Sequence, residues 1–439
     1  MLLPTTILLD IALFLPDASS MFAFLNALGS SDLRGPLEPL WQLKTYHSHV
    51  WPHLWLSPTH CFTDSEETRV HLEAMAPYYT HVILDGEFNV AWLRQHFLPT
   101  TSTEWRQFPN CGVQRLAEWF DEWAKLRITR IISTLDDVNP LVSYLPKLQP
   151  HLEHMTLDRG FDSWFRPSIA PIIDFLATSQ HLTELCLKNV YATTDECINQ
   201  MVLNLTRWLK RNPVRKLTLD PIYTEDDQVA CEFITTMFAC PTMEELSLTC
   251  LAVPPFLTFV TPLPMHTLHM DMCSDRLLTL EQFTPALKDS KVKHLALQNA
   301  PYFSHDGLKS FMRALAHTNV VDLDFTDCRF GDMAVKDCVI PYLNDTSLEQ
   351  LILDENGITD ASMTQLADAI QTNATIQCLS VRRCPQITTV GVQALLNASI
   401  NRPIQMKKIS IGDVASISLD HAARLQAKSV FYGIDIDFT

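Results

Sequence analysis

Apolar residues recur along most of the chain in one short motif: an apolar residue, two free positions, a second apolar residue, one free position and a third apolar residue. From residue 151 onward the first members of this motif are Leu152, Leu182, Val214, Met243, Met265, Val292, Val320, Leu348, Ile376, Met406 and Phe431. Their spacing averages about 28 residues, which is the period of a unit that stacks into a solenoid. Between the motifs, apolar residues at helical spacing predict a helix with one buried face, as at Leu308, Phe311, Met312 and Leu315. Each repeat is therefore predicted to be one strand followed by one helix.

The ninth position of the unit carries a second signal, because it holds a small residue at Cys273, Cys328, Asn356 and Cys384, where the chain must turn under the strand. The stretches SHDGLKSFMRALAHTNVVDLDF and ITDASMTQLADAIQTNATIQCLSV resemble the ribonuclease-inhibitor class of leucine-rich repeat. The resemblance covers about two thirds of the chain and is strongest over 292–414. Stacked units of this kind share one continuous core, so we expect an α/β leucine-rich-repeat solenoid: a curved horseshoe with parallel strands on the concave side and helices on the convex side.

The pattern divides the chain into three predicted parts. Residues 1–45 form a small all-α module, 46–125 a connector with degenerate first repeats, and 126–439 the repeat array. In and beside the connector, YYTHVILDGE and RITRIIST are predicted strands with a helix over 117–126 between them. The segment FYGIDIDFT fits the strand motif and is predicted to be the last strand of the array, in part a cap.

Residues 1–45 show helical spacing in place of the strand motif. Ile7, Ile11, Phe14 and Leu15 share one helical face, and Pro16 ends this first helix. Ser19 or Ser20 is expected to cap a second helix. So short a segment buries little of its own surface, and it is expected to need a docking partner, either the array or another protein.

The module resembles an F-box in the order of Leu3-Pro4, Ile7-Leu8, Ile11, Leu15 before Pro16-Asp17, and a closing Leu40-Trp41. It departs from the family pattern at Thr5-Thr6, where an acidic residue is usual, and at Arg34, which stands alone where basic and aromatic residues usually cluster. The resemblance implies that Leu3, Pro4, Ile7, Leu8, Ile11, Leu15, Leu40 and Trp41 bind a Skp-type adaptor carried on a cullin scaffold. The chain would then be the substrate receptor of an SCF-type ubiquitin ligase. In the alternative interpretation the module is only a solenoid cap, and the protein is an interaction scaffold or inhibitor.

Composition narrows the function classes. The net charge of −17 and the lack of a basic stripe argue against nucleic acid as a partner. The 11 glycines contain no GxG pair, which argues against dinucleotide and P-loop sites. We also expect no metal site, since Pro52 interrupts the helical spacing of His49 and His53. Without GxSxG or HExxH motifs, no catalytic residue and no cofactor are predicted, and the protein is expected to be non-enzymatic.

The compartment is predicted from the cysteines and the hydropathy. None of the 12 cysteines forms a CxxC pair, so free thiols in a reducing compartment are expected. No apolar run approaches about 18 residues, so no membrane span is predicted. These features predict an intracellular protein, cytoplasmic or nuclear.

Alternation along the predicted strands assigns the concave face. The residues beside the inward apolar positions include Asp158, Lys188, Asp220, His269, Asp271, Asp324, Asp354 and Arg382. This set is mainly acidic, so the sequence predicts a protein substrate with some basic character. The alternative is a solvated face that binds nothing, since any strand array must show polar residues there.

Overall fold

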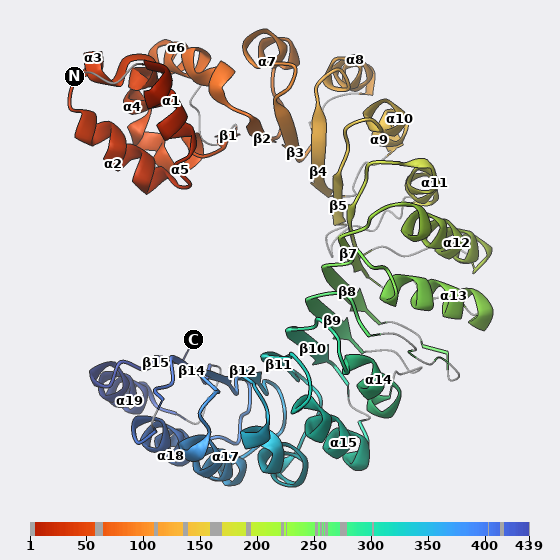
Figure 1. Ribbon diagram of the computed structural model, residues 1–439, viewed down its shortest axis with the longest axis vertical. Helices are drawn as coiled ribbons and strands as arrows, with labels where there is room; N and C mark the ends of the chain where they lie inside the picture. Colours follow the sequence, from red (N-terminus) through yellow and green to blue (C-terminus); the bar gives the residue numbers. More distant parts are fainter. Residues whose placement is uncertain are drawn as a thin grey trace. The chain divides into compact units, whose positions relative to one another are not determined.

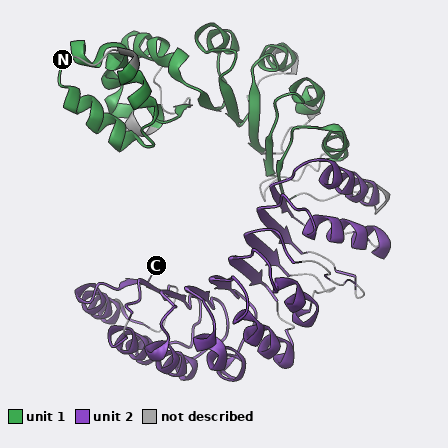
Figure 2. Cartoon of the chain, in the orientation of Figure 1, with its two compact units in different colours: residues 1–189 green, residues 190–439 purple. Residues whose placement is uncertain are grey.

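The computed structural model describes the chain in two compact units, residues 1–189 and 190–439 (Figure 2). The described residues are 5–57, 65–108, 113–134, 139–158, 169–189, 195–220, 224, 226–250, 253–254, 257, 259, 262–272, 279–300, 303–402, 404–412 and 417–438. The predicted boundaries after residues 45 and 125 do not coincide with this division, and they stay a prediction.

Unit 1 begins with a group of short helices and continues as strands alternating with helices (Figure 1). The helical group consists of α1 Thr5–Leu13, α2 Ala18–Leu28, α3 Ser31–Arg34, η1 Gly35–Leu37, α4 Glu38–Gln42, η2 Lys44–Tyr46 and α5 His47–Val50. The alternating part consists of β1 Leu54–Leu56, α6 Glu66–Met75, η4 Ala76–Tyr78, β2 His81–Asp85, α7 Val90–His96, β3 Ser102–Arg106, α8 Val113–Trp123, β4 Ile128–Thr134, α9 Asn139–Val142, α10 Leu145–Leu148, β5 His154–Asp158, α11 Ala170–Thr178 and β6 Glu184–Lys188.

Unit 2 repeats the same alternation of strand and helix. Its elements are α12 Asp195–Arg211, β7 Lys216–Leu219, α13 Asp227–Phe238, β8 Glu245–Thr249, β9 Thr267–Asp271, α14 Leu280–Leu287, β10 His294–Gln298, α15 His305–Leu315, β11 Asp322–Asp324, α16 Asp332–Ala334, η6 Val335–Val339, η7 Ile340–Asp345, β12 Gln350–Ile352, α17 Asp360–Thr372, β13 Cys378–Ser380, α18 Thr389–Ile400, β14 Lys408–Ser410, α19 Leu419–Phe431 and β15 Asp435–Asp437.

Within each unit the strands pair in parallel and in chain order, and the helices pack on one side of them (Figure 1). The other side of the strands is called the strand face below, and no described helix between successive strands of the same unit covers it (Figure 1). This is the architecture of a leucine-rich-repeat solenoid, as the sequence predicts.

The central residue of the apolar motif forms the core. Leu295, Leu323, Leu351, Leu379 and Ile409 lie opposite one another on successive strands, and each is at most 2% exposed. Burying each such side chain stabilises the fold by roughly 1.5–3 kcal/mol. The strand register therefore follows from the apolar spacing, because a slip of one residue would turn this row toward solvent.

The ninth-position prediction is confirmed at three of its four residues. Cys328, Asn356 and Cys384 are all buried at the turn after their strands, while Cys273 lies outside the described residues. The thiols of Cys186, Cys231, Cys240, Cys328, Cys338, Cys378 and Cys384 are free. Cys250, in contrast, is disulfide-bonded, so the expectation of free thiols is wrong there.

Three local features differ from the sequence prediction or were missed by it. Strands β2, β4 and β15 form where strands were predicted, but β1 and β3 were not predicted. The helix predicted over 117–126 begins earlier, as α8. The cap of α2 is Asp17, whose Oδ1 accepts a hydrogen bond from the Ser20 backbone N–H at 2.8 Å, and not Ser19 or Ser20. An ionised aspartate at this position also interacts favourably with the helix dipole.

Candidate interaction surfaces

The first candidate surface is the outward face of α1. Ile7 is 42% exposed, Ile11 39%, Leu13 49% and Phe14 86%. Ile7, Ile11 and Phe14 are spaced at i, i+4 and i+7, so they lie along one side of the helix. A group of large apolar side chains left in water on one helix face marks a place where another molecule can bind.

The predicted adaptor-binding residues fall into two groups. Ile7 and Ile11 form this exposed face and Leu15 is half-buried beside it, whereas Leu8 and Leu40 are buried and pack the interior of the module. Leu3 and Pro4 lie outside the described residues. Leu8 and Leu40 therefore support the surface from behind instead of contributing to it.

Arg34 and Trp41 hold the end of the module together. Arg34 is 6% exposed, and its guanidinium donates to the Gly29 carbonyl at 3.0 Å and to Glu38 Oε2 at 2.6 Å. Its guanidinium carbon lies 4.6 Å from the centre of the Trp41 ring, and Lys44 Nζ lies 4.5 Å from the same ring. Such cation–π contacts help to fix the orientation of the indole. Arg34 thus has a structural role in the module.

Hydrogen bonds also tie the helical group, α1 to α5, to the residues just before β1 and β2. The Trp51 indole N–H donates to the Leu15 carbonyl at 2.9 Å, and the Tyr79 hydroxyl donates to the Val50 carbonyl at 2.7 Å. Burial raises the pKa of the Tyr79 hydroxyl, which is consistent with a permanent donor. The end of α1 is therefore anchored to the repeats while its apolar face stays open.

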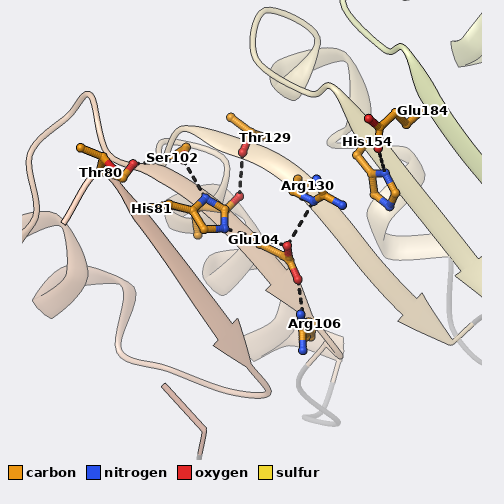
Figure 3. A network of polar contacts seen from close by, with 10 residues as sticks. Thr80, His81, Ser102, Glu104, Arg106, Thr129, Arg130, His154 and Glu184 are labelled. Atoms are coloured by element: carbon orange, nitrogen blue, oxygen red, sulfur yellow. Dashed lines mark hydrogen bonds and ion pairs between the residues drawn. The ribbon is translucent and has the colours of Figure 1, made fainter. Parts of the chain in front are cut away.

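The second candidate surface is the strand face of unit 1 (Figure 3). Glu104 on β3 is 6% exposed and lies between Arg106 Nε at 2.6 Å and Arg130 Nε at 3.1 Å. His81 Nε2 lies 3.9 Å from the same carboxylate. The two arginines are partly exposed, so the buried charge is compensated by cations that also face solvent.

The row continues onto the next strands, because Glu104 on β3 lies opposite Arg130 on β4, and β4, β5 and β6 pair without a shift in register. Arg130 lies opposite His154, and His154 Nδ1 contacts Glu184 Oε2 at 2.8 Å. Burial lowers the pKa of both His81 and His154, with nearby cations adding to the effect and Glu104 and Glu184 opposing it. Both imidazoles are accordingly expected to be neutral near pH 7.

Sequence reasoning missed this network. Ser102, Glu104 and Arg106 alternate in STEWR as the polar positions of a strand should, but the segment lacks the leucine spacing used to find strands. The period-2 alternation of polar residues is the signal that could have found it.

The third candidate surface is the strand face of unit 2, which holds six of the eight predicted substrate-binding residues: Asp220, His269, Asp271, Asp324, Asp354 and Arg382. The other two, Asp158 and Lys188, belong to unit 1, where Asp158 accepts a hydrogen bond from Asn189 Nδ2 at 2.9 Å and Lys188 is exposed. Apart from Lys188, these residues are partly buried, as expected for side chains that stand between neighbouring strands.

Hydrogen bonds orient two of the aspartates on the strand face of unit 2. His269 Nε2 contacts Gln298 Oε1 at 2.9 Å, and Gln298 Nε2 donates to Asp324 Oδ2 at 2.6 Å. Asp354 accepts hydrogen bonds from the Ser380 hydroxyl at 2.6 Å and from the Arg382 backbone N–H at 2.8 Å. Burial nevertheless raises the pKa of Asp354, with Asp324 contributing. Asp271 Oδ1 is buried and accepts no hydrogen bond from the described part of the chain.

Comparison with known proteins agrees with the repeat architecture. A family model described as a leucine-rich repeat matches residues 372–396, which run from the end of α17 through β13 into α18. The fold is that of a leucine-rich-repeat solenoid. No curated protein is significantly similar to the sequence.

Among solved structures, the chain is similar to one in the crystal structure of the Rad7 and Elc1 complex in yeast, with 15% identity and a TM-score of 0.46, over 98% of this chain and 91% of that chain. A second similar structure is PH0766 from Pyrococcus horikoshii OT3, with 8% identity and a TM-score of 0.19, over 88% of this chain and 80% of that chain. Neither similarity bears on what this chain binds.

No described helix is long and apolar enough to cross a membrane. Nor do the described histidine, cysteine and carboxylate side chains form a group of three that could hold a metal ion. His49 packs edge-on against Trp55, with ring centres 5.2 Å apart, and His53 packs against His81 at 4.9 Å.

Proposed function

We propose that the protein is a non-catalytic substrate receptor of an SCF-type ubiquitin ligase. In this proposal the module of residues 1–45 binds a Skp-type adaptor, which joins it to a cullin scaffold. The strand face of the array holds a protein substrate. The benefit of such an arrangement is effective concentration, because tethering keeps substrate lysines within reach of the conjugating enzyme.

The exposed apolar face of α1 is the observation that carries the proposal. A cap would be expected to bury its apolar residues against the first repeats, yet Ile7, Ile11 and Phe14 are open to solvent while Leu8 and Leu40 fill the interior. The hydrogen bonds from Trp51 and Tyr79 already anchor this part of the chain without using that face. The open face supports a binding role over that of a simple cap.

Co-purification of the full chain with a Skp-type adaptor from the same cell tests the first half of the proposal. We expect capture by the wild type and loss of capture in the double variant Ile7→Asp, Ile11→Asp, since each charge would have to be buried in the interface. The control is Val390→Asp, which places the same charge on a 65% exposed apolar residue of α18 and should leave capture intact. Circular dichroism verifies that each variant is folded. Equal capture of both variants, or no capture of the wild type, would favour a scaffold with a helical cap.

The strand face of unit 2 supports a substrate segment with basic character. Asp271, Asp324 and Asp354 lie on neighbouring parts of one face, and two of them are already oriented by internal hydrogen bonds. Neutralising all three to asparagine keeps their size and one acceptor oxygen on each side chain. We expect slower association with a substrate captured by the wild type and a weaker dependence on salt. Unchanged binding by this triple variant would mean that charge on this face does not select the substrate.

A further inference from the structure

A cavity opens between two repeats of unit 1, away from the three surfaces described above. It has a volume of about 240 Å³ and lies between the repeat of β2 and α7 and the repeat of β3 and α8. Val82, Leu84 and Leu93 line it and are each at most 2% exposed. Phe97, Leu98 and Leu126 line it as well and are more exposed to solvent.

Local irregularity of the repeats explains why space remains here. Helix α7 has 7 residues, while α8 has 11, so α7 covers less of the strands beside it. The pairing of β3 with β4 also shifts register between Thr103 and Glu104. A short helix next to a shifted strand leaves side chains of the two repeats unable to fill the space between them.

Two threonines also line the cavity. Thr103 is 6% exposed and Thr101 is 5% exposed. The Thr101 hydroxyl donates to the Tyr79 carbonyl at 3.0 Å. Apart from these two threonines, the buried side chains that line the cavity are apolar, which suits the hydrocarbon part of a ligand.

The rim of the cavity is cationic. Arg94, Lys125 and Arg127 stand there, and Glu122 accepts hydrogen bonds from Arg94 and Lys125. Arg127 donates to the neutral Thr100 carbonyl at 3.0 Å and has no acidic partner among the described residues. The rim thus keeps an excess of positive charge on a chain whose net charge is −17.

We propose that this cavity binds a small carboxylic acid with an apolar body, such as a medium-chain fatty acid. The apolar body would replace water against Leu84 and Leu93, and the carboxylate would face Arg127 at the rim. The volume lies just below the roughly 300–1,000 Å³ of pockets that take drug-sized ligands, which favours a ligand of about ten heavy atoms. A cationic ligand would be repelled by the positive charges at the rim. A neutral alcohol would bind more weakly than a carboxylate, because it has no charge to interact with Arg127.

Calorimetric titration of the full chain with octanoate, and with octan-1-ol as the uncharged analogue, tests the proposal. We expect saturable binding of one octanoate per chain, with octan-1-ol weaker by about fivefold or more. Arg127→Gln should weaken octanoate by about fivefold and leave octan-1-ol unchanged. The matched control is Arg313→Gln, because Arg313 likewise has a neutral partner, the Tyr342 hydroxyl at 3.3 Å.

Two substitutions at Thr103 test whether the cavity is the binding site. Thr103→Leu fills the space and should abolish binding of both ligands, whereas Thr103→Val keeps the volume nearly constant and should leave the binding of both unchanged. The Arg127→Gln comparison keeps the test decisive if the leucine variant does not fold. The proposal is overturned if octan-1-ol binds as tightly as octanoate, if Arg313→Gln weakens binding as much as Arg127→Gln, or if binding survives unchanged in a folded Thr103→Leu variant.

Discussion

Replacing Asn356 with alanine should destabilise unit 2 more than almost any other single polar substitution. The side chain is fully buried at the turn after β12. Its Nδ2 donates to the Phe325 carbonyl at 2.6 Å and to the Asp354 carbonyl at 3.0 Å. Its Oδ1 accepts from the backbone N–H groups of Cys328 at 3.1 Å and of Phe330 at 2.9 Å. One amide thus satisfies four backbone groups of two successive repeats.

The magnitude follows from those four contacts. A hydrogen bond contributes about 1 kcal/mol net, and an orphaned buried backbone group costs about as much or more, so Asn356→Ala should lower the free energy of unfolding by about 4 kcal/mol. Asn356→Cys should fall between alanine and wild type. Cys328, at the equivalent position of the preceding repeat, donates its thiol to the Leu297 carbonyl at 3.0 Å and so preserves one such contact.

Urea denaturation followed by circular dichroism measures the difference. The matched control is Asn344→Ala, which removes one exposed hydrogen bond to the Thr372 hydroxyl at 3.1 Å and should change the stability by less than about 0.5 kcal/mol. A loss below about 1 kcal/mol for Asn356→Ala, or a cysteine variant no more stable than the alanine variant, would refute the reasoning.

Three further outcomes follow from buried polar groups. Burial raises the pKa of Asp332, but hydrogen bonds from Ser362 and Thr359 outweigh it and hold the pKa below its usual value. The ionised carboxylate therefore contributes its full stabilisation of the fold above about pH 4, and this stabilisation is lost as the pH falls further. The difference in free energy of unfolding between wild type and Asp332→Asn, measured by urea denaturation, should therefore shrink in acid. Arg402→Met should lower the free energy of unfolding by about 2 kcal/mol in the same assay. The buried guanidinium donates to the Ile376 carbonyl at 2.6 Å, and methionine would leave that carbonyl without its donor. Glu104→Gln should lower the melting temperature, because Arg106 and Arg130 would then repel each other without a buried anion between them. An unchanged melting temperature would contradict this role of Glu104.

Much of the fold could be predicted from the sequence because its repeats are local. Each strand is specified by three apolar residues within six positions, and stacking identical units fixes the pairing without any long-range information. Strands β5 to β15 all form at the predicted motifs, and Asn356 and Cys384 occupy the buried turn expected of them. The same locality explains the failures, since β1 and β3 lack the motif and were missed.

The candidate surfaces could be predicted only in part. Periodicity placed Ile7 and Leu8 on neighbouring positions of one helix, but only packing against the rest of the module decides that Ile7 is open and Leu8 is buried. Alternation likewise placed Asp324 and Asp354 on the strand face, but their hydrogen bonds to Gln298 and Ser380 come from adjacent strands.

By itself, then, the sequence determined the strand–helix repeat, its period and the side of each strand that faces the core, because these depend on residues close together in the chain. The tertiary structure alone decided which apolar residues of the first helix stay exposed, how Glu104 is enclosed by Arg106 and Arg130, and where a cavity remains beside Thr103. Each of these depends on contacts between different helices or strands or on a mismatch between neighbouring repeats. No local pattern encodes the volume left when two such repeats meet.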